Sequence, residues 1–361
     1  MSPQQQTGPR VDKTGAPSMS DVASLAGVAL GTVSNALNHP QKVAEGTLLR
    51  IQAAIDELGF VRNDQARSLA RGRSSTMGLI VTDIGNSFFV DIARGAEVGA
   101  QADGMSLLLA NSDNDLAKEQ TYLDLFEQSR FAGILLAPFE ASTEGLERIK
   151  GRGQPVLLLN VATPVEKGCS VIVDNEYGGY IAARHLIELG RTRLAFVGGP
   201  DRLAPLLARR LGVERAIAEQ GGTVTLEEII VGAVNAPEGR SVGEAIIQRN
   251  PAERPDGIVA ASDLLALGMI QTFQNVVRVP DEIAIIGYDN NNAVWDSLIP
   301  ISTIGQPGFE MGARGAELLA DAIKNPDTHE HQVLTLLPHL MARASSVGSP
   351  SLAPASPAPV A

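Results

Sequence analysis

The stretch SDVASLAGVALGTVSNALNH, residues 20–39, decides how the N-terminal part of the chain folds. It is nearly free of charge, and its apolar residues recur at helical spacing on either side of Gly27. Ser20 is placed to cap a first helix that runs through Leu25, and a second helix is predicted over residues 29–37. Two helices joined by a short glycine turn form a helix-turn-helix, whose second helix enters the major groove of DNA.

A third predicted helix, TLLRIQAAIDELGF at residues 47–60, closes a small core with the first two. The side chains expected in this core are Val22, Ala23, Leu25, Val33, Ala36, Leu37, Leu48, Ile51, Ile55 and Leu58. The alternative is a small packing module that has no partner.

Charge is divided unevenly along the chain. The full sequence of 361 residues has a formal net charge of −12. Residues 1–75 hold eight basic and six acidic residues, whereas the remainder holds 21 basic and 35 acidic ones. A mildly basic N-terminal part is compatible with DNA binding, and the acidity belongs to the C-terminal part.

Length and composition indicate a soluble globular protein with more than one domain. Apolar residues make up 44% of the chain, but no run of them is long enough to span a membrane. The N-terminus lacks the apolar segment of a secretory signal. The single cysteine, Cys169, excludes an internal disulfide framework and any thiolate zinc cluster. These features predict a cytoplasmic protein without a cofactor or a bound metal.

From Met77 onward, short apolar runs alternate with amphipathic helical segments. The candidate strands are MGLIVTD, SLLLANS, AGILLAP, PVLLLN, SVIVD, RLAFVGG, EEIIVG, GIVAAS and EIAIIGY. This alternation predicts parallel sheets that are covered by helices on both faces. The strands are too many for one such sheet at this chain length. We therefore expect two lobes, with a ligand cleft beyond the carboxyl ends of their strands.

The order and spacing of these motifs resemble the LacI/GalR family of bacterial transcription repressors over residues 18–345. The resemblance rests on MSDVASLAGVALGTVSNALN and the segment VAEGTLLRIQAAIDELGFVRNDQARSLARGRSSTMGLIV, and further on DIGNSFFVDIARGAE, VIVDNEYGGYIAARHLIELG and VPDEIAIIGYDN. It implies an N-terminal all-α helix-turn-helix DNA-binding domain plus an α/β two-lobed periplasmic-binding-protein-like domain. It also implies a homodimer that binds a pseudo-palindromic operator. The family's tetramerising leucine repeat is absent here, which favours a dimer.

The resemblance also suggests where the domains begin and end. We expect a DNA-binding domain at 18–64, a hinge helix or linker at 65–76 and an effector-binding and dimerisation domain at 77–345. Disordered tails are expected at 1–17 and 346–361, both of low complexity. Within the large domain, the expected N-lobe covers about 77–173 and 304–333, and the C-lobe covers about 174–303 and 334–345.

The family pattern assigns DNA contacts mainly to the second helix. The first residues of this helix and those one turn later are expected to face the bases. The residues on its flanks are expected to contact phosphate or to hold the helix against the phosphate backbone. Asn35 stands where arginine is usual, and asparagine prefers adenine whereas arginine pairs with guanine. Leu30 offers only apolar contact, and Ala29 replaces the usual serine, so we expect a half-site unlike the commonest ones. The expected DNA-contacting residues are Ser20, Ala29, Leu30, Gly31, Thr32, Ser34, Asn35, Asn38, Asn63, Arg67 and Leu69.

The segment NDQARSLARG, residues 63–72, resembles the family's hinge helix. Leu69 matches the leucine that is wedged into the minor groove, where an apolar wedge unstacks a base step and bends the duplex. Arg67, Arg71 and Arg73 flank it and can meet phosphate. A helix this short is marginal by itself, so it is expected to order only when two copies pair on DNA. The alternative is an ordinary exposed linker.

The large body is expected to bind a small-molecule effector between its lobes. Polar and aromatic residues follow the candidate strands, and the matched effector-binding positions are Asp83, Asn86, Phe88, Phe89, Asn160, Arg209, Ser262, Asp289 and Gln306. An arginine fork and a carboxylate suit paired hydroxyl groups. Val234 and Val161 depart from residues that are usual in sugar binders, so a sugar or sugar-like polyol is only the default expectation.

Several of these residues also have a structural interpretation. Phe88 could belong to the core, and Asp289 could cap a helix. For Asp263, which follows Ser262, the cap interpretation is favoured. Asp174 and Asn175 are also expected to act as caps.

The expected mechanism is linkage, in which a ligand changes operator affinity only through its different affinity for two lobe arrangements. The rival functions are an enzyme and a ligand-binding protein without operator specificity. The sequence has no GxxxxGK[ST], GxSxG or HExxH motif, and its five histidines show no metal-ligand spacing. His329 and His331 are interpreted as solvated surface. No catalytic residue is therefore expected.

Overall fold

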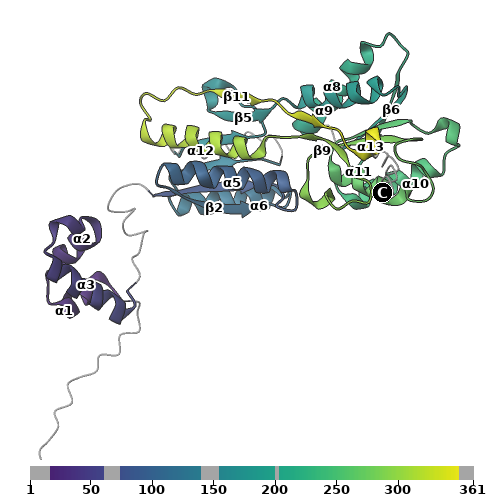
Figure 1. Ribbon diagram of the computed structural model, residues 1–361. Helices are drawn as coiled ribbons and strands as arrows, with labels where there is room; N and C mark the ends of the chain where they lie inside the picture. The colour runs from purple at the N-terminus through teal and green to yellow at the C-terminus, as the bar shows by residue number, and fades with distance from the viewer. Residues whose placement is uncertain (1–16, 61–73, 140–153, 200–202, 349–361) are drawn as a thin grey trace, which may run out of the picture. The chain divides into compact units, whose positions relative to one another are not determined.

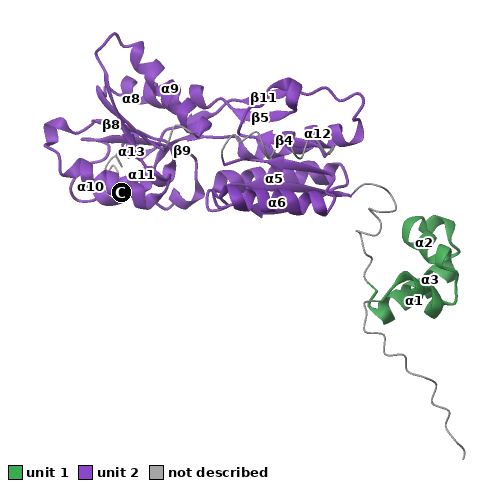
Figure 2. Ribbon diagram, turned by 180° about the vertical axis from the view of Figure 1, so that it is seen from behind, with its two compact units in different colours: residues 1–72 green, residues 73–361 purple. Residues whose placement is uncertain are grey.

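The computed structural model describes residues 17–60, 74–139, 154–199 and 203–348. The chain divides into two compact units, residues 1–72 and 73–361, which are coloured separately in Figure 2. None of the helices in these described ranges is long and apolar enough to cross a membrane.

Within its described residues, 17–60, the first unit contains three α-helices and one short 3-10 helix: α1 (Met19–Ala26), α2 (Leu30–Asn38), η1 (Pro40–Lys42) and α3 (Glu45–Leu58). Ser18 caps α1, because its hydroxyl accepts from the backbone N–H of Asp21 and the Asp21 carboxylate accepts in return. The predicted cap at Ser20 is therefore wrong by two residues. Gly27 ends α1 with φ of 65°, a left-handed conformation that favours glycine.

The core of the first unit joins all three α-helices. Val22, Val33 and Ile51 are fully or almost fully buried, and Val28, Leu37, Leu48, Ile55 and Leu58 pack around them. The prediction that Leu25 lies in this core is wrong, since its side chain is 46% exposed. The buried residues of α1 are Val22, Ala23 and Ala26, and Leu25 lies outside the face that they form.

The described residues of the second unit form two six-stranded sheets, one in each lobe (Figure 1). The first sheet has the order β11-β5-β4-β3-β1-β2, and its neighbouring strands all pair in parallel. Its strands are β1 (Thr76–Val81), β2 (Ser106–Asn111), β3 (Gly133–Leu136), β4 (Val156–Leu159), β5 (Ser170–Val173) and β11 (Val333–Leu336).

The second sheet has the order β12-β10-β9-β8-β6-β7, and only the β10–β12 pair is antiparallel. Its strands are β6 (Arg193–Gly198), β7 (Thr225–Ile230), β8 (Gly257–Ala260), β9 (Ala284–Asp289), β10 (Ser302–Gly305) and β12 (His339–Met341). The predicted strands are thus present, while β10, β11 and β12 were not among them.

The chain passes between the lobes after β5, after β10 and after β11. The expected lobe boundaries at 303/304 and 333/334 fall inside β10 and β11. In the structure, both crossings between the lobes come after the ends of these strands. The expected C-terminal tail also begins too early. Ser346 lies in α13 (Ala344–Val347), where it is buried and bonds the Ser302 hydroxyl at 2.6 Å.

Helices cover the faces of both sheets. They are α5 (Ser87–Ala102), α6 (Leu116–Gln128), α8 (Asn175–Glu188), α9 (Ala204–Ala218), α10 (Ala236–Ile247), α11 (Asp263–Phe273) and α12 (Gly308–Lys324). The short 3-10 helices η2 (Val165–Lys167), η3 (Pro251–Glu253) and η4 (Asn292–Val294) lie in the connections. Helices α5 and α12 lie side by side in both views, as α8 and α9 do (Figures 1 and 2).

Glycines let the helices α8 and α9 approach closely. A Cβ atom on Gly179 would lie 1.9 Å from the carbonyl oxygen of Arg209, and one on Gly212 would lie 1.9 Å from that of Glu176. No side chain larger than hydrogen fits at such a distance. This reciprocal contact fixes the backbone of Arg209 relative to the start of α8.

Candidate functional site

Helix α2 presents an uncharged, exposed row of residues. Leu30 is 51% exposed, and Ala29, Gly31 and Asn35 are exposed beside it. A Cβ atom on Gly31 would meet nothing within 4 Å, so this face is open. The side chains of Val33 and Ala36 point into the core of the first unit instead.

The flanks of α2 are partly buried at Thr32, Ser34 and Asn38. The Asn38 side-chain amide donates to the Ser34 carbonyl oxygen at 2.9 Å, which ends the helix without a charged residue. Ser20 lies inside α1, where its carbonyl oxygen accepts from the Ser24 hydroxyl. The remaining expected DNA-contacting residues, Asn63, Arg67 and Leu69, lie outside the described residues, as do Arg71 and Arg73.

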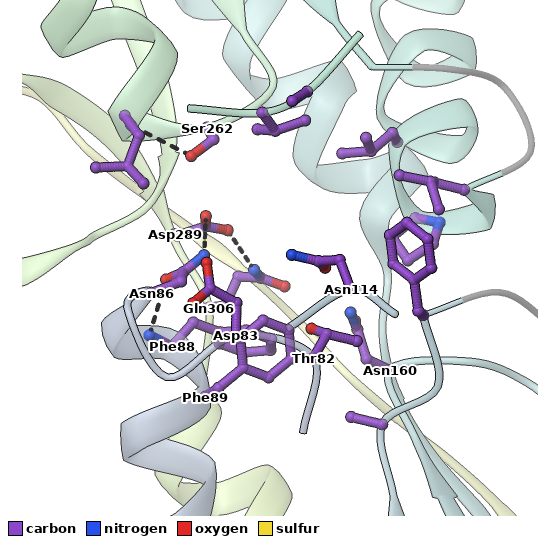
Figure 3. A pocket seen from close by; sticks show the side chains of 18 of the residues that line it. Thr82, Asp83, Asn86, Phe88, Phe89, Asn114, Asn160, Ser262, Asp289 and Gln306 are labelled. Carbon is purple, nitrogen blue, oxygen red and sulfur yellow. Dashed lines mark hydrogen bonds between the residues drawn. The ribbon is translucent and has the colours of Figure 1, made fainter. Parts of the chain in front are cut away.

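The expected effector-binding residues line one cavity of about 240 Å³ between the two lobes (Figure 3). The first lobe supplies one group of side chains and the second lobe another, and Gln306 follows β10 where the chain crosses between the lobes. From the first lobe come Asp83, Asn86, Phe88, Phe89 and Asn160, and from the second come Arg209, Ser262 and Asp289.

Asp289 ends β9 and is the centre of the polar network in Figure 3. One carboxylate oxygen accepts from the Asn86 side-chain amide at 2.8 Å, and the other accepts from the Gln306 amide at 2.7 Å. Because Asn86 belongs to the first lobe, its bond to Asp289 joins the two lobes. Burial raises the pKa of the Asp289 carboxyl, while the nearby Arg209 guanidinium opposes that rise. Asp289 caps no helix.

Arg209 is held on several sides and is 5% exposed. Its Nε donates to the Asn175 side-chain oxygen at 2.9 Å, and Nη1 donates to the Ala261 carbonyl oxygen at 2.6 Å. Nη2 lies 3.6 Å from Asp289 Oδ1, and the guanidinium stacks 3.6 Å from the Tyr288 ring centroid. These contacts fix the guanidinium before any ligand enters.

Two expected caps need correction. Ser262, not Asp263, caps α11, since its hydroxyl accepts from the backbone N–H of Leu264. Asp263 is fully buried and accepts from the backbone N–H of Asn291 at 2.7 Å. Burial, and then the charge of Asp289, raise the pKa of Asp263 from 3.8 to about 8.

Of the two other residues that were expected to act as caps, one caps a helix and one does not. Asp174 caps α8 as predicted, by accepting from the Tyr177 backbone N–H. Asn175 is the first residue of α8 and binds Arg209 rather than capping the helix. Asn86 is a cap that the sequence analysis did not recognise, and it accepts from the Phe88 backbone N–H at 3.0 Å. Phe88 belongs to the core, with 3% exposure, and also lines the cavity.

Two buried acceptor atoms in the cavity lack a hydrogen-bond partner among the described residues: Asn160 Oδ1 and Gln306 Oε1. A buried oxygen without a donor costs about 1–3 kcal/mol. A ligand that carries hydroxyl or N–H donors would remove this cost.

The sequence analysis missed some of the cavity lining. Thr82 and Asn114 follow the strands β1 and β2, so the rule that ligands sit beyond strand ends could have found them. Phe139 follows β3 at the same edge of the sheet. No such signal marks the apolar residues Leu203 and Leu206, which reach the cavity from a loop and from α9.

Comparison with known families gives two matches. Residues 18–63 match the model for bacterial regulatory proteins of the lacI family, and residues 183–346 match a periplasmic binding protein-like domain. An HTH-type transcriptional repressor PurR from Photobacterium profundum is 32% identical over 327 residues, which cover 90% of this chain and 97% of that protein. The chain belongs to the LacI family. The predicted family is therefore confirmed.

Solved structures agree with this assignment. The transcriptional regulator CelR in its cellobiose complex has 27% identity and a TM-score of 0.68, and the match covers 91% of this chain and all of that one. The Lac repressor bound to ONPG has 20% identity and a TM-score of 0.79, with 92% of this chain covered and all of that chain, which shows the shared fold.

The LacI-family protein is thus a DNA-binding transcriptional regulator with a ligand-binding domain, and the predicted fold class is confirmed. Its relatives are transcriptional repressors rather than enzymes. The match over residues 18–63 and the likeness to a transcriptional repressor argue against the alternative of a ligand-binding protein without operator specificity.

Proposed function

We propose that α2 reads base edges in the major groove and that the protein represses transcription in the cytoplasm, where its DNA partner lies. The observation that carries this proposal is the exposed, uncharged row of Leu30, Gly31 and Asn35 on α2 of a LacI-family helix-turn-helix. The side chains of Thr32, Ser34 and Asn38 flank that row and suit phosphate contacts.

The chemistry of this row predicts the half-site. Asn35 is suited to a bidentate contact with adenine, worth about 1–3 kcal/mol of discrimination against another base. Leu30 offers only an apolar contact, for which a thymine methyl group is the natural partner. Gly31 leaves room for the backbone to approach the bases. The half-site should therefore be richer in A·T pairs at the positions that face α2.

Selection of binding sites from a random duplex library tests this proposal directly. We expect an A·T-containing palindrome, and we expect Asn35→Ala to lose discrimination at one base pair of each half-site by about 5- to 150-fold. Gln52→Ala on α3 is a matched control, because Gln52 is exposed and its side-chain amide donates to Asp56 one helical turn away. An unchanged base preference in Asn35→Ala would contradict the assignment.

We also propose that the effector is a neutral, hydroxyl-rich molecule such as a sugar or polyol. The free acceptors Asn160 Oδ1 and Gln306 Oε1 need donors, and Asp83 and Asp289 add carboxylate acceptors. Arg209 is the one cation among the described lining residues, and Asn175, Ala261 and Asp289 already engage it. The cavity thus favours a hydroxyl donor over a phosphate. The likeness to the CelR–cellobiose complex also supports a sugar.

A thermal-shift screen over neutral sugars, polyols, sugar phosphates and purines tests the ligand class. We expect a neutral sugar or polyol to raise the melting temperature, and Asn160→Gly to abolish that shift. Asn160 has φ of 63°, which glycine tolerates. Asn275→Gly is the matched control, since Asn275 has φ of 64° and lies outside this cavity. A shift caused by sugar phosphates alone would contradict the proposed ligand class.

We further propose that the protein acts as a homodimer. Exposed apolar side chains lie on β2, an edge strand of the first sheet, where Leu108 and Leu109 are 49% and 43% exposed. Val98 on α5 and Leu125 on α6 are also exposed. In the second lobe, Trp295 and Leu298 are 59% and 82% exposed after β9. Exposed apolar patches of this kind are typical of protein interfaces.

A further inference from the structure

The single cysteine and two histidines gather in the first lobe, although Cys169 lies 160 residues before the first of these histidines. Cys169 Sγ lies 3.2 Å from His329 Nε2 and 3.6 Å from His331 Nδ1. One candidate ligand atom from each residue lies within 4.8 Å of the other two. The spacing of the histidines along the sequence did not indicate this cluster, because it forms only in the folded chain. The side chain of His329 is 3% exposed, so its interpretation as solvated surface is wrong.

Strand pairing brings these residues together. Cys169 directly precedes β5, and His331 comes two residues before β11. The two strands pair in parallel with Ser170 opposite Val333, which places the preceding residues side by side. His329 is anchored to the end of α12, because its backbone N–H donates to the Asn325 carbonyl oxygen at 2.8 Å.

The distances are close to those around a tetrahedral metal ion. Zinc binds thiolate sulfur at about 2.3 Å and imidazole nitrogen at about 2.0–2.1 Å, so tetrahedral geometry separates sulfur and nitrogen by about 3.6 Å. The sulfur–nitrogen distances of 3.6 and 3.2 Å thus need an adjustment of only a few tenths of an ångström.

We propose that Cys169, His329 and His331 form a binding site for a Zn²⁺ ion, with one thiolate and two imidazole ligands. The three protein ligands leave a fourth position for water, as in other open zinc sites. His331 is exposed, so an ion can enter from solvent.

Asp321 supports the site from α12. Its carboxylate Oδ2 lies 2.6 Å from His329 Nδ1, and accepts the proton of that nitrogen. The lone pair of Nε2 then faces Cys169 Sγ, as metal binding requires. Histidine ligands in metal sites commonly donate their second N–H to a carboxylate in this way. A hydrogen bond between the Cys169 thiol and the His329 imidazole alone would not need His331, whose Nδ1 lies 3.6 Å from the same sulfur.

The site is separate from the effector cavity. It lies where β5 and β11 begin, whereas the cavity is lined by residues that follow the ends of β1, β3 and β4. A bound ion would join the start of β5 to the segment before β11 and, through Asp321, to α12. We therefore expect the ion to stabilise the first lobe against unfolding.

The test uses untagged, full-length protein that has been stripped with a chelator and titrated with Zn²⁺ against a chromophoric competitor. We expect one Zn²⁺ per chain with a Kd tighter than about 1 μM. Cys169 is the only cysteine of the chain, so a thiol reagent reports on this site alone. Bound Zn²⁺ should slow the reaction of that thiol. Bound Co²⁺ should show a thiolate charge-transfer band and the intense visible bands of a four-coordinate ion.

Variants distinguish Zn²⁺ binding at Cys169, His329 and His331 from adventitious Zn²⁺ binding elsewhere on the protein. Cys169→Ser and His331→Asn should each abolish tight binding, and Asp321→Asn should weaken it about 10- to 100-fold. His331 is exposed, so His331→Asn keeps the test valid even if Cys169→Ser fails to fold. His39→Asn is the control, because His39 lies in the first unit and should leave binding unchanged. Absence of 1:1 binding in the wild type, or tight binding that survives His331→Asn, would overturn the proposal.

Discussion

The variant Gly179→Ala tests how the packing of α8 against α9 positions the effector cavity. Its new Cβ atom would lie 1.9 Å from the Arg209 carbonyl oxygen, and real Cβ atoms essentially never come closer than 3.0 Å. The backbone of α9 must therefore retreat from α8 by about 1.1 Å. Arg209 reaches back to Asn175 on α8 through a 2.9 Å bond, which would lengthen to about 4.0 Å and break.

The cost of this change has two parts. Overpacking of a tight interior contact costs about 1–3 kcal/mol. Loss of a hydrogen bond to a charged group costs about 1.5–3 kcal/mol. We therefore expect Gly179→Ala to lower the free energy of unfolding of the second unit by about 2.5–6 kcal/mol, and to weaken effector binding because the Arg209 guanidinium moves away from Asp289.

Urea unfolding measures the effect, with the transition midpoint compared at an unchanged slope. Gly46→Ala in α3 is the matched control, because a Cβ atom there meets nothing within 4 Å. Gly46→Ala should stabilise the first unit by about 0.5–1 kcal/mol, since alanine has a higher helix propensity than glycine. If Gly179→Ala lowered the free energy of unfolding of the second unit by less than about 1 kcal/mol, the close packing of α8 against α9 would be refuted as the cause.

Three further predictions concern other parts of the chain. Ser18→Ala should destabilise the first unit by about 0.5–2 kcal/mol in thermal unfolding, because it removes the cap of α1. An equal loss of stability in Ser20→Ala would contradict the assignment of the cap to Ser18. Leu298→Asp should shift the protein from dimer to monomer in sedimentation without altering its circular dichroism, and an intact dimer would exclude Leu298 from the interface. The Asp263 carboxyl has a pKa of about 8 in the folded protein and about 3.8 in the unfolded chain. Because the folded state holds this proton more tightly, the contribution of Asp263 to the free energy of unfolding is full below pH 3.8 and is lost as the pH rises to about 8. Asp263→Asn should remove that part of the pH dependence of urea unfolding, and an unchanged profile would contradict it.

The sequence predicted the features that depend on local pattern. The helix-turn-helix followed from apolar spacing around Gly27, and the strands of both sheets followed from short apolar runs. The strands β10, β11 and β12 were not predicted. Strands β11 and β12 are largely exposed, so their residues lack a continuous apolar run.

Two kinds of feature could not be predicted from the sequence: the choice between equivalent local caps, and the pairing of distant residues. A serine two positions away can cap a helix equally well, so the cap at Ser18 was assigned to Ser20. Asp263 looked like a cap because it opens α11, but the fold buries it under Asn291. Cys169 and His329 are separated by 160 residues and meet only through the β5–β11 register. No spacing along the chain indicates that contact.

Fluorescence anisotropy of the full-length protein on its selected duplex, with and without the ligand found in the thermal screen, measures whether the effector controls operator binding. We expect a preference for that duplex over a scrambled one, and a change in duplex affinity of about 5- to 150-fold when the ligand binds. Linkage requires the duplex to change ligand affinity by the same factor. Equal affinity for both duplexes, whether or not ligand is present, would contradict the account.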